Sequence, residues 1–268
     1  MGNPNFLRMP EIENWSEMVD FTGSLANVAA ACTTSYFRHP IDIMTKQDKS
    51  PVTIADQETE RLLREMILKN YPSHGILGEE HGSEGLDRDD LWVIDPIDGT
   101  KSFIAGLPVY GTLIAYMHLQ RVRIGAISMP AMHEFWIGVQ GQGCFYNGEK
   151  CNVSACTKLS DAILMTTSPD YFTGTDKGRF SEVSEKTRLQ RYGGDCYIYG
   201  MLASGWTDIV IEQGLQSYDY MALVPVIQEA GGIITDWSGD CLNLHSDGNV
   251  LAAATPELHQ QALDILRR

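Results

Sequence analysis

A short apolar run that ends in two carboxylates constrains this chain more than any other stretch. Leu91–Ile94 is apolar with β-branched members, which predicts a buried strand. Asp95 and Asp98 follow, and a helix could begin at Gly99–Thr100. Carboxylate oxygens are the ligands that hard cations prefer, and free backbone N–H groups at a helix start can bind an anion. The stretch therefore predicts metal-assisted phosphate chemistry.

The charge of the chain limits its partners. The 268 residues carry 35 Asp and Glu against 20 Lys and Arg, a formal net charge of −15. Such an acidic surface repels nucleic acid and anionic membranes, so neither is expected as a partner. It repels phosphate esters as well, so a site that handles a small phosphomonoester needs cations from solution.

Cysteine usage and hydropathy predict a cytoplasmic protein. The six cysteines contain no Cys-x-x-Cys pair, which in a chain of this length indicates reduced thiols rather than a disulfide framework. No apolar run approaches the roughly 18 residues of a membrane span. Residues 1–10 lack the apolar core of a signal peptide.

The first part of the chain is predicted to hold two helices and an antiparallel sheet. Apolar spacing predicts a helix over Trp15–Tyr36 and another, capped by Thr53, that runs to about Asn70. Between them, 46–51 is predicted as an exposed loop. Further elements are predicted in chain order: a strand at 75–78, a mobile charged loop at 81–90, a short helix at 100–106, and strands at 110–119, 122–129 and 134–139.

The second part alternates between strands and helices. Strands are predicted at 162–167, 208–212, 232–235 and 250–254, and helices within 175–187, 195–205, 219–230 and 256–268, with Pro225 able to kink the third helix. The pattern shifts near residue 150. We therefore expect an α/β (α+β layered) fold with a metal-binding α+β half, residues 1–150, and an α/β half, residues 151–268.

Acidic residues far apart in the sequence are predicted to form one metal site. Glu79, Asp95 and Asp98 follow predicted strands, whose ends converge on one edge of a sheet. Asp219 opens a predicted helix after an apolar strand, and Asp56 lies at another helix start. No Lys or Arg lies within two residues of Asp95, Asp98 or Asp219. The alternative is that these acids are ordinary solvated surface.

Phosphatase routes through a protein nucleophile fit the sequence less well. An aspartyl nucleophile needs two aspartates one residue apart, whereas two residues separate Asp95 from Asp98. No cysteine lies in a Gly-rich loop that ends in Arg, and no Gly-x-Ser-x-Gly elbow is present. The chain therefore lacks the parts that these routes need.

Several motifs together resemble the inositol monophosphatase family of lithium-sensitive, magnesium-dependent phosphatases. The central one is Asp95–Thr100, with Gly78–Glu80 before it and Tyr218–Asp219 after it. Ser50–Asp56 and Glu229–Gly232 resemble the flanking motifs of the family. The resemblance spans nearly the whole chain and implies a layered αβαβα sandwich of two intimately packed halves, and a homodimer.

The same resemblance implies a role for individual residues. The implied metal ligands are oxygen atoms: Glu79, Asp95 and the Ile97 carbonyl for a first Mg²⁺, Asp95, Asp98 and Asp219 for a second, and Glu79 for a weaker third. Mn²⁺ could replace Mg²⁺. Asp56 and Thr100, with Glu79, would polarise the attacking water, and the N–H groups of Gly99 and Thr100 would bind the phosphate. Lys46 resembles a family lysine, although a solvated loop lysine is an equal alternative.

The leaving alcohol is expected to be recognised by the second half. Inositol phosphatases carry Trp-Asp at the last ligand and Gly-(Ser/Thr)-Ala before the preceding helix, whereas this chain has Tyr218–Asp219 and Gly193–Tyr197. Both departures resemble histidinol-phosphate phosphatases. Asp195 and Glu212 are the candidates to pair with a cationic alcohol, unless Asp195 merely caps its helix.

These residues lead to one substrate hypothesis, the hydrolysis of L-histidinol phosphate to histidinol and phosphate. Inositol 1-phosphate and other small phosphomonoesters are the enzymatic alternatives. A non-enzymatic family member kept as a binding or regulatory scaffold is the competing class.

Overall fold

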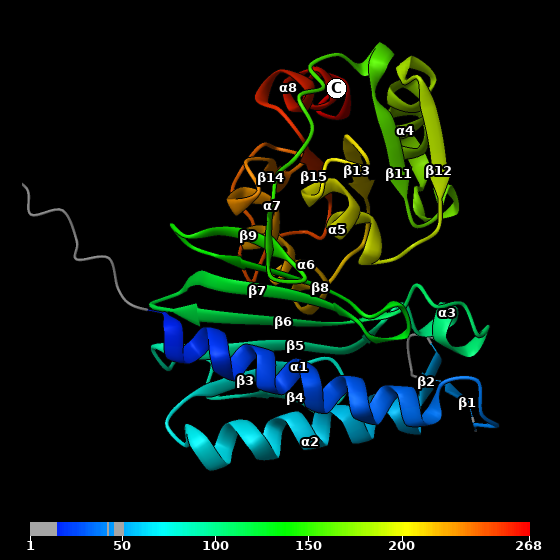
Figure 1. The fold of residues 1–268 in the computed structure, drawn as a ribbon. Helices are drawn as coiled ribbons and strands as arrows, with labels where there is room; N and C mark the ends of the chain where they lie inside the picture. Colours follow the sequence, from blue (N-terminus) through cyan, green and yellow to red (C-terminus); the bar gives the residue numbers. More distant parts are fainter. Residues whose placement is uncertain (1–14, 42, 46–50) are drawn as a thin grey trace, which may run out of the picture.

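The computed structural model describes residues 15–41, 43–45 and 51–268, and it consists of five stacked layers (Figure 1). Two helices cover the lower face of an eight-stranded sheet, and a middle layer of helices separates that sheet from a five-stranded one. Two further helices form the outer layer. This arrangement confirms the predicted αβαβα sandwich.

The first sheet and its outer helices come from the first part of the chain. The helices are α1 (Ser16–Tyr36) and α2 (Ile54–Asn70), preceded by the strand pair β1 (Ile43–Thr45) and β2 (Pro51–Thr53). The strand order is β10-β9-β8-β7-β6-β5-β3-β4. Its strands are β3 (Gly75–Gly78), β4 (Gly82–Glu84), β5 (Asp90–Asp98), β6 (Gly111–His118), β7 (Arg121–Met129), β8 (Glu134–Val139), β9 (Gly143–Tyr146) and β10 (Glu149–Cys151).

The middle layer, the second sheet and the outer helices come from the rest of the chain. The middle helices are α5 (Tyr197–Ala203), α6 (Ser217–Tyr220) and α7 (Leu223–Glu229). The sheet has the order β12-β11-β13-β15-β14, with β11 (Ile163–Thr166), β12 (Leu189–Tyr192), β13 (Ile209–Glu212), β14 (Ile233–Asp236) and β15 (Val250–Ala253). The outer helices are α4 (Gly174–Lys186) and α8 (Pro256–Leu266).

The remaining helices are short. They are α3 (Thr100–Ile104), which follows β5, and 3-10 turns at Pro130–Met132, Leu159–Asp161 and Pro169–Tyr171. Because the two sheets use consecutive parts of the chain, residues 75–151 and 163–253, we keep the division near residue 150 as a proposal.

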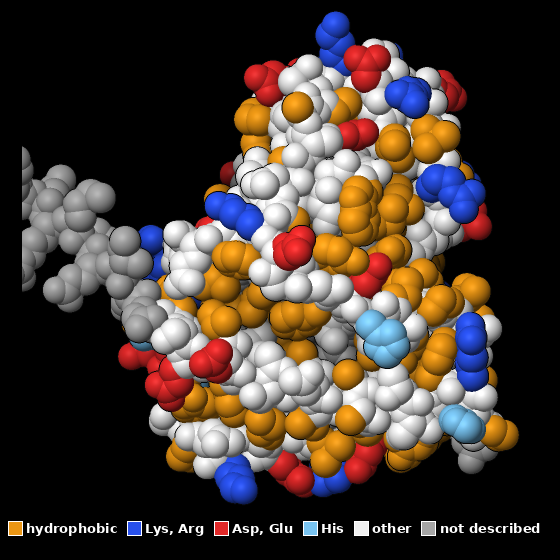
Figure 2. Space-filling model, viewed as in Figure 1, with side chains coloured by type: hydrophobic (Ala, Val, Ile, Leu, Met, Phe, Trp, Pro, Cys, Tyr) orange, Lys and Arg blue, Asp and Glu red, His pale blue; other side chains and the backbone are white. Residues whose placement is uncertain are grey.

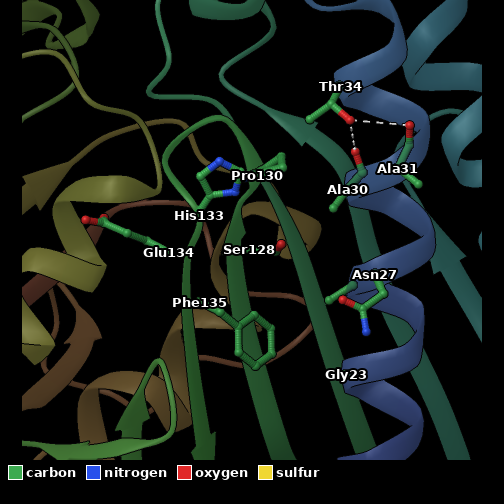
Figure 3. A pocket seen from close by; sticks show the side chains of 11 residues that line it. Gly23, Asn27, Ala30, Ala31, Thr34, Ser128, Pro130, His133, Glu134 and Phe135 are labelled. Atoms are coloured by element: carbon green, nitrogen blue, oxygen red, sulfur yellow. Dashed lines mark hydrogen bonds between the residues drawn. The ribbon is translucent and has the colours of Figure 1, made fainter.

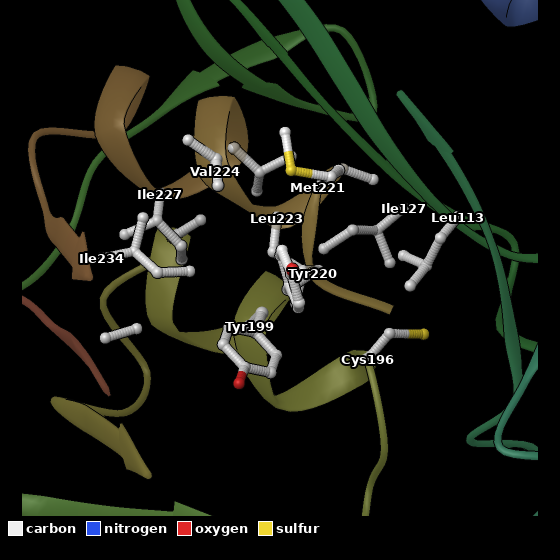
Figure 4. Packing of buried hydrophobic residues seen from close by; sticks show 14 of the residues in the cluster. Leu113, Ile127, Cys196, Tyr199, Tyr220, Met221, Leu223, Val224, Ile227 and Ile234 are labelled. Carbon is white, nitrogen blue, oxygen red and sulfur yellow. The ribbon is translucent and has the colours of Figure 1, made fainter. Parts of the chain in front are cut away.

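The middle layer is pressed closely onto the first sheet. Apolar side chains of α7, among them Val224 and Ile227, pack in the buried cluster that also holds Leu113 and Ile127 of the sheet (Figure 4). A Cβ at Gly125 of β7 would lie 2.0 Å from the Ala222 carbonyl oxygen, and one at Gly138 of β8 would lie 2.3 Å from the Pro225 carbonyl oxygen. Glycine therefore permits this approach, which places the start of α7 directly against the sheet.

Several predicted elements are corrected by the structure. The mobile loop expected at 81–90 contains β4, which pairs antiparallel with β3. The first sheet is not purely antiparallel, because β3 and β5 run parallel. β5 extends to Asp98 instead of ending at Ile94, and β12 was not predicted. The reason in each case is pairing with a neighbouring strand, which stabilises segments whose own pattern is weak.

The single helix expected over 219–230 is divided. α6 ends at Tyr220 and α7 begins at Leu223. Pro225 has no N–H to donate to the carbonyl four residues earlier, at Met221, so the helix is interrupted there.

Charged and hydrophobic side chains both lie on the surface of the described part of the chain. On the face drawn in Figure 2, Lys and Arg side chains lie scattered, and hydrophobic side chains gather at the level of the first sheet and the middle helices. Within residues 15–41, 43–45 and 51–268, no helix is long and apolar enough to cross a membrane. All six cysteines are free thiols. Lys46 and most of the predicted loop at 46–51 lie outside the described residues.

Candidate functional site

Three carboxylates from two distant segments converge where the first sheet meets the middle layer. One oxygen each of Asp95, Asp98 and Asp219 lies within 4.8 Å of the others. The first two belong to the end of β5 and the third to α6. Asp95 is buried, and the other two are half-buried. The structure therefore brings together three of the acids that were predicted to share one site.

An irregularity in β5 brings both of its aspartates to this point. Residues three apart in a regular strand face opposite sides of a sheet. Here Asp95 pairs with Leu113 but Asp98 pairs with Gly111, so three steps along β5 match two along β6. This extra residue is a β-bulge, which re-aims the following side chain. The Ile97 N–H donates to Asp95 Oδ1 at 3.0 Å and stabilises the bend.

The three carboxyl groups repel one another in a buried setting. Burial, together with the charges of Glu79, Asp98 and Asp219, raises the pKa of Asp95 well above its usual range. Burial and the charge of Asp195 raise the pKa of Asp98 to about 7. Burial and the charge of Asp98 raise the pKa of Asp219.

No protein cation offsets this repulsion in the part of the chain that the structure describes, because no Lys or Arg there forms an ion pair with Asp95, Asp98 or Asp219. An all-oxygen donor set with uncompensated negative charge fits a hard divalent cation.

Glu79 lies at the edge of this cluster. It follows β3, whose parallel neighbour β5 brings Gly78 opposite Ile94. The Glu79 N–H donates to the Ile94 carbonyl at 3.3 Å. Its charge is among those that raise the pKa of Asp95, although Glu79 does not belong to the set of three within 4.8 Å. Glu79 can therefore supply a further carboxylate oxygen to a cation that Asp95 also binds.

Asp56 and Thr100 are joined by a hydrogen bond beside the cluster. Asp56 Oδ2 accepts from the N–H and hydroxyl of Thr53, at 2.8 and 2.6 Å, in the capping box that begins α2. The Thr100 hydroxyl lies 3.3 Å from Asp56 Oδ1 and 3.2 Å from the Ile97 carbonyl oxygen. Burial raises the pKa of Asp56, against the opposing effect of the Thr53 bonds. Asp56 is thus placed to accept a proton through Thr100.

Asp195 faces the end of β5 rather than capping α5. Its backbone has a φ of +46°, and α5 shows no side-chain cap bond at its N-cap residue, Cys196. Its carboxylate accepts from the Ser102 hydroxyl at 2.7 Å. A Cβ on Gly99, where φ is +82°, would lie 2.9 Å from that carboxylate. The capping alternative for Asp195 is therefore wrong.

Glu212 forms the far wall of a small pocket next to the cluster. The pocket has a volume of about 150 Å³, and its lining includes Asp98, Asp195, Glu212 and Asp219. Glu212 accepts from the Thr167 N–H at 2.5 Å, and burial raises its pKa to about 7. An acidic pocket of this kind suits a ligand group that carries positive charge or donates hydrogen bonds.

The family model for the inositol monophosphatase family matches residues 14–268. The chain belongs to this family. Its relatives include the bifunctional phosphatase IMPL2, chloroplastic, of Arabidopsis thaliana, which is 46% identical over 91% of this chain and 73% of that protein. A histidinol-phosphatase of Chlorobaculum parvum is 34% identical over 85% of this chain and 89% of that protein.

Solved structures agree with the family assignment. An inositol monophosphatase from Zymomonas mobilis is 40% identical and superposes with a TM-score of 0.87, covering 96% of this chain and all of that one (100%). The Thermotoga maritima IMPase TM1415 is 27% identical, with a TM-score of 0.84, and covers 94% and 97% of the two chains. The chain is therefore a phosphatase of the inositol monophosphatase family with the family's layered fold.

Three residues of the acidic pocket were missed from the sequence. They are Tyr199, Tyr171 and Thr167, and within the described residues the buried Tyr199 hydroxyl has no hydrogen-bond partner. Tyr199 lies in the first turn of α5, close in sequence to Asp195, and this nearness is the one signal that could have indicated it. A search for the site by cavity size alone would have led to a different place. A larger cavity of about 490 Å³ lies between α1 and residues 128–135 (Figure 3) and contains none of the predicted site residues.

Proposed function

We propose that this chain is a Mg²⁺-dependent phosphomonoesterase that hydrolyses L-histidinol phosphate to histidinol and phosphate. The observation that carries the proposal is the meeting of Asp95, Asp98 and Asp219 beside a pocket that Asp98 and Asp219 line together with Asp195 and Glu212. The first set suits metal and phosphate, and the second set suits a cationic leaving alcohol.

The proposed ligands of two to three Mg²⁺ ions, which Mn²⁺ could replace, are oxygen donors: Glu79, Asp95, the Ile97 carbonyl, Asp98 and Asp219. Bound there, the ions would neutralise the phosphate and lower the pKa of a water molecule. The burial and mutual repulsion of the carboxylates support this assignment.

The protein's own groups orient the reacting parts. Thr100 would hold the attacking water, and Asp56 would accept its proton along the hydrogen bond between them. Glu79, whose charge acts on Asp95, would assist in polarising the water. The N–H groups of Gly99 and Thr100, at the start of α3, would donate to phosphate oxygens.

The pocket supports histidinol phosphate as the substrate. Histidinol carries an amine and an imidazole, and both can pair with the carboxylates of Asp195 and Glu212 through charge-assisted hydrogen bonds. The name of the Chlorobaculum parvum relative, a histidinol-phosphatase, supports this substrate. The Zymomonas mobilis structure, named an inositol monophosphatase, favours inositol 1-phosphate as the second candidate.

The substrate is tested by comparing kcat/KM for the two esters in the presence of Mg²⁺. We expect histidinol phosphate to be preferred by at least about tenfold, since a charge-assisted hydrogen bond contributes roughly 1.5–3 kcal/mol. A preference of the same size for inositol 1-phosphate would refute the substrate. Failure to release phosphate from either ester would favour the non-enzymatic scaffold.

Glu212→Gln is expected to act selectively on the cationic substrate. The amide can still accept the Thr167 N–H bond but loses the charge, so KM for histidinol phosphate should rise about tenfold. KM for inositol 1-phosphate should change less than about threefold, because neutral hydroxyls lose only a weaker bond. Glu182→Gln, on the exposed face of α4, is the matched control. An equal change in KM for both esters would show that Glu212 does not select the substrate.

The remaining proposals rest on the family resemblance and on the composition. We propose a homodimer that acts on small phosphomonoesters, with no nucleic-acid or membrane partner. We also propose a cytoplasmic location, while the Arabidopsis thaliana relative is named as chloroplastic.

A further inference from the structure

One buried carboxylate lies outside the candidate site and is used by none of the steps above. Glu60 lies on α2, one helical turn after Asp56, and its side chain is 0% exposed. It forms an ion pair with Arg64 Nε at 2.7 Å. A buried charge is costly unless it is paired and hydrogen-bonded, so the contacts of Glu60 indicate what it is retained for.

The other contacts of Glu60 all reach the turn that follows β3. Its carboxylate accepts the backbone N–H of Glu80 at 2.6 Å and that of His81 at 3.1 Å. A Cβ on Gly78 would lie 2.1 Å from Glu60 Oε1, so a side chain there would displace the carboxylate. The residues on both sides of Glu79 are therefore in contact with Glu60.

Two neighbours of Glu60 on α2 hold the same turn. The Arg64 guanidinium donates to the Gly82 carbonyl. His81 Nε2 hydrogen-bonds the Gln57 carbonyl at 3.0 Å. Gln57, Glu60 and Arg64 are spaced by three and four residues, so they lie on one face of the helix. This face clamps residues 78–82 as a unit.

The clamp connects two parts of the candidate site. The same helix carries Asp56 in its first turn, and the clamped turn carries Glu79, whose N–H donates at 3.3 Å to the carbonyl of Ile94, the residue before Asp95. We propose that Glu60 is a positioning residue, which holds Glu79 beside Asp95 and fixes its distance from Asp56. This inference rests on the proposed metal-dependent function. Partners that orient a metal ligand typically change metal affinity by about 10–100-fold when removed.

A merely structural role for Glu60 makes a different prediction. If Glu60 only stabilised the fold, its replacement would lower the melting temperature but leave the affinity of the folded protein for Mg²⁺ unchanged. Metal affinity measured on folded protein therefore separates the two roles.

Glu60→Gln is the variant that tests the inference in the full-length protein. The amide oxygen can still accept one N–H, but the NH₂ group then faces the second N–H donor, and Arg64 loses its charged partner. We expect the Kd for Mg²⁺, measured by isothermal titration without substrate, to rise about tenfold or more. The turnover rate at saturating Mg²⁺ should recover towards that of the wild type.

Glu58→Gln is the matched control, since it makes the same substitution two residues earlier on the same helix. Glu58 pairs with Arg61 on the exposed side of α2 and does not reach the turn. Its Kd for Mg²⁺ should stay within about twofold of the wild type, because exposed ion pairs contribute little.

Each outcome of the titration decides one question. A folded Glu60→Gln variant that binds Mg²⁺ like the wild type overturns the positioning role and leaves the proposed function intact. A wild type that binds no Mg²⁺ overturns both. If Glu60→Gln does not fold, Glu60→Asp keeps the charge but shortens the reach, and an unchanged Kd in that variant also overturns the inference.

Discussion

Asp98→Asn and Asp219→Asn are each expected to reduce phosphate release by roughly 10³-fold or more while the fold is retained. Both side chains contribute an oxygen to the cluster within 4.8 Å, and an amide supplies a weaker, uncharged ligand. A metal ion contributes several kcal/mol of transition-state stabilisation, and each 1.4 kcal/mol is a tenfold change in rate. Turnover of histidinol phosphate at saturating Mg²⁺ measures the loss.

Asp264→Asn is the control for these two variants. Asp264 lies exposed on α8, and its carboxylate accepts a hydrogen bond from Gln260 one turn earlier, so the same substitution there should leave turnover unchanged. Circular dichroism should show the same secondary structure in all three variants. Wild-type turnover in either Asp98→Asn or Asp219→Asn would show that the cluster is not the catalytic centre.

Removal of divalent metal is expected to destabilise the protein more at pH 7.5 than at pH 5.5. Asp98, with a folded pKa of about 7 against an ordinary 3.8, binds its proton more tightly in the folded state. Between these two values the folded state holds more protons than the unfolded state, so stability falls as pH rises. Asp95 and Asp219 shift in the same direction. Mg²⁺ should offset this loss, because it neutralises the ionised carboxylates.

Melting temperatures with a chelator and with Mg²⁺, at both pH values, measure this effect. Buried His259, whose pKa is lowered to about 4, acts in the opposite direction as the pH falls, so the wild type alone mixes two effects. The difference in melting temperature between Asp219→Asn and the wild type isolates the contribution of the acidic cluster, because His259 is the same in both proteins. Without metal, the variant should gain more stability at pH 7.5 than at pH 5.5, at roughly 2–4 °C per kcal/mol. A wild-type melting temperature that does not respond to Mg²⁺ would contradict the proposed site.

Local pattern was sufficient for most of the elements that place the site. The capping box of Thr53 and Asp56, the apolar run from Leu91 and the strand–helix alternation after residue 150 are short-range signals, because each depends on neighbours in the chain. The motif order pointed to the family, and the family model confirmed it over residues 14–268.

Features that depend on pairing partners were beyond the sequence. The β-bulge that turns Asp98 to the same site as Asp95 exists only because β5 pairs with β6 in that register. The interruption before α7 shows the same dependence, since a proline can kink a helix or end it according to what packs around it.

Residue types and their spacing were enough to predict the fold class, the family and the set of acidic side chains. The way those side chains meet depends on contacts between distant segments. The structure shows that Asp195 faces Gly99 instead of capping α5, and that Glu60 on α2 holds the turn beside Glu79. These contacts join residues about 20 to 96 positions apart, and a contact at such a separation depends on how whole layers pack rather than on any local propensity.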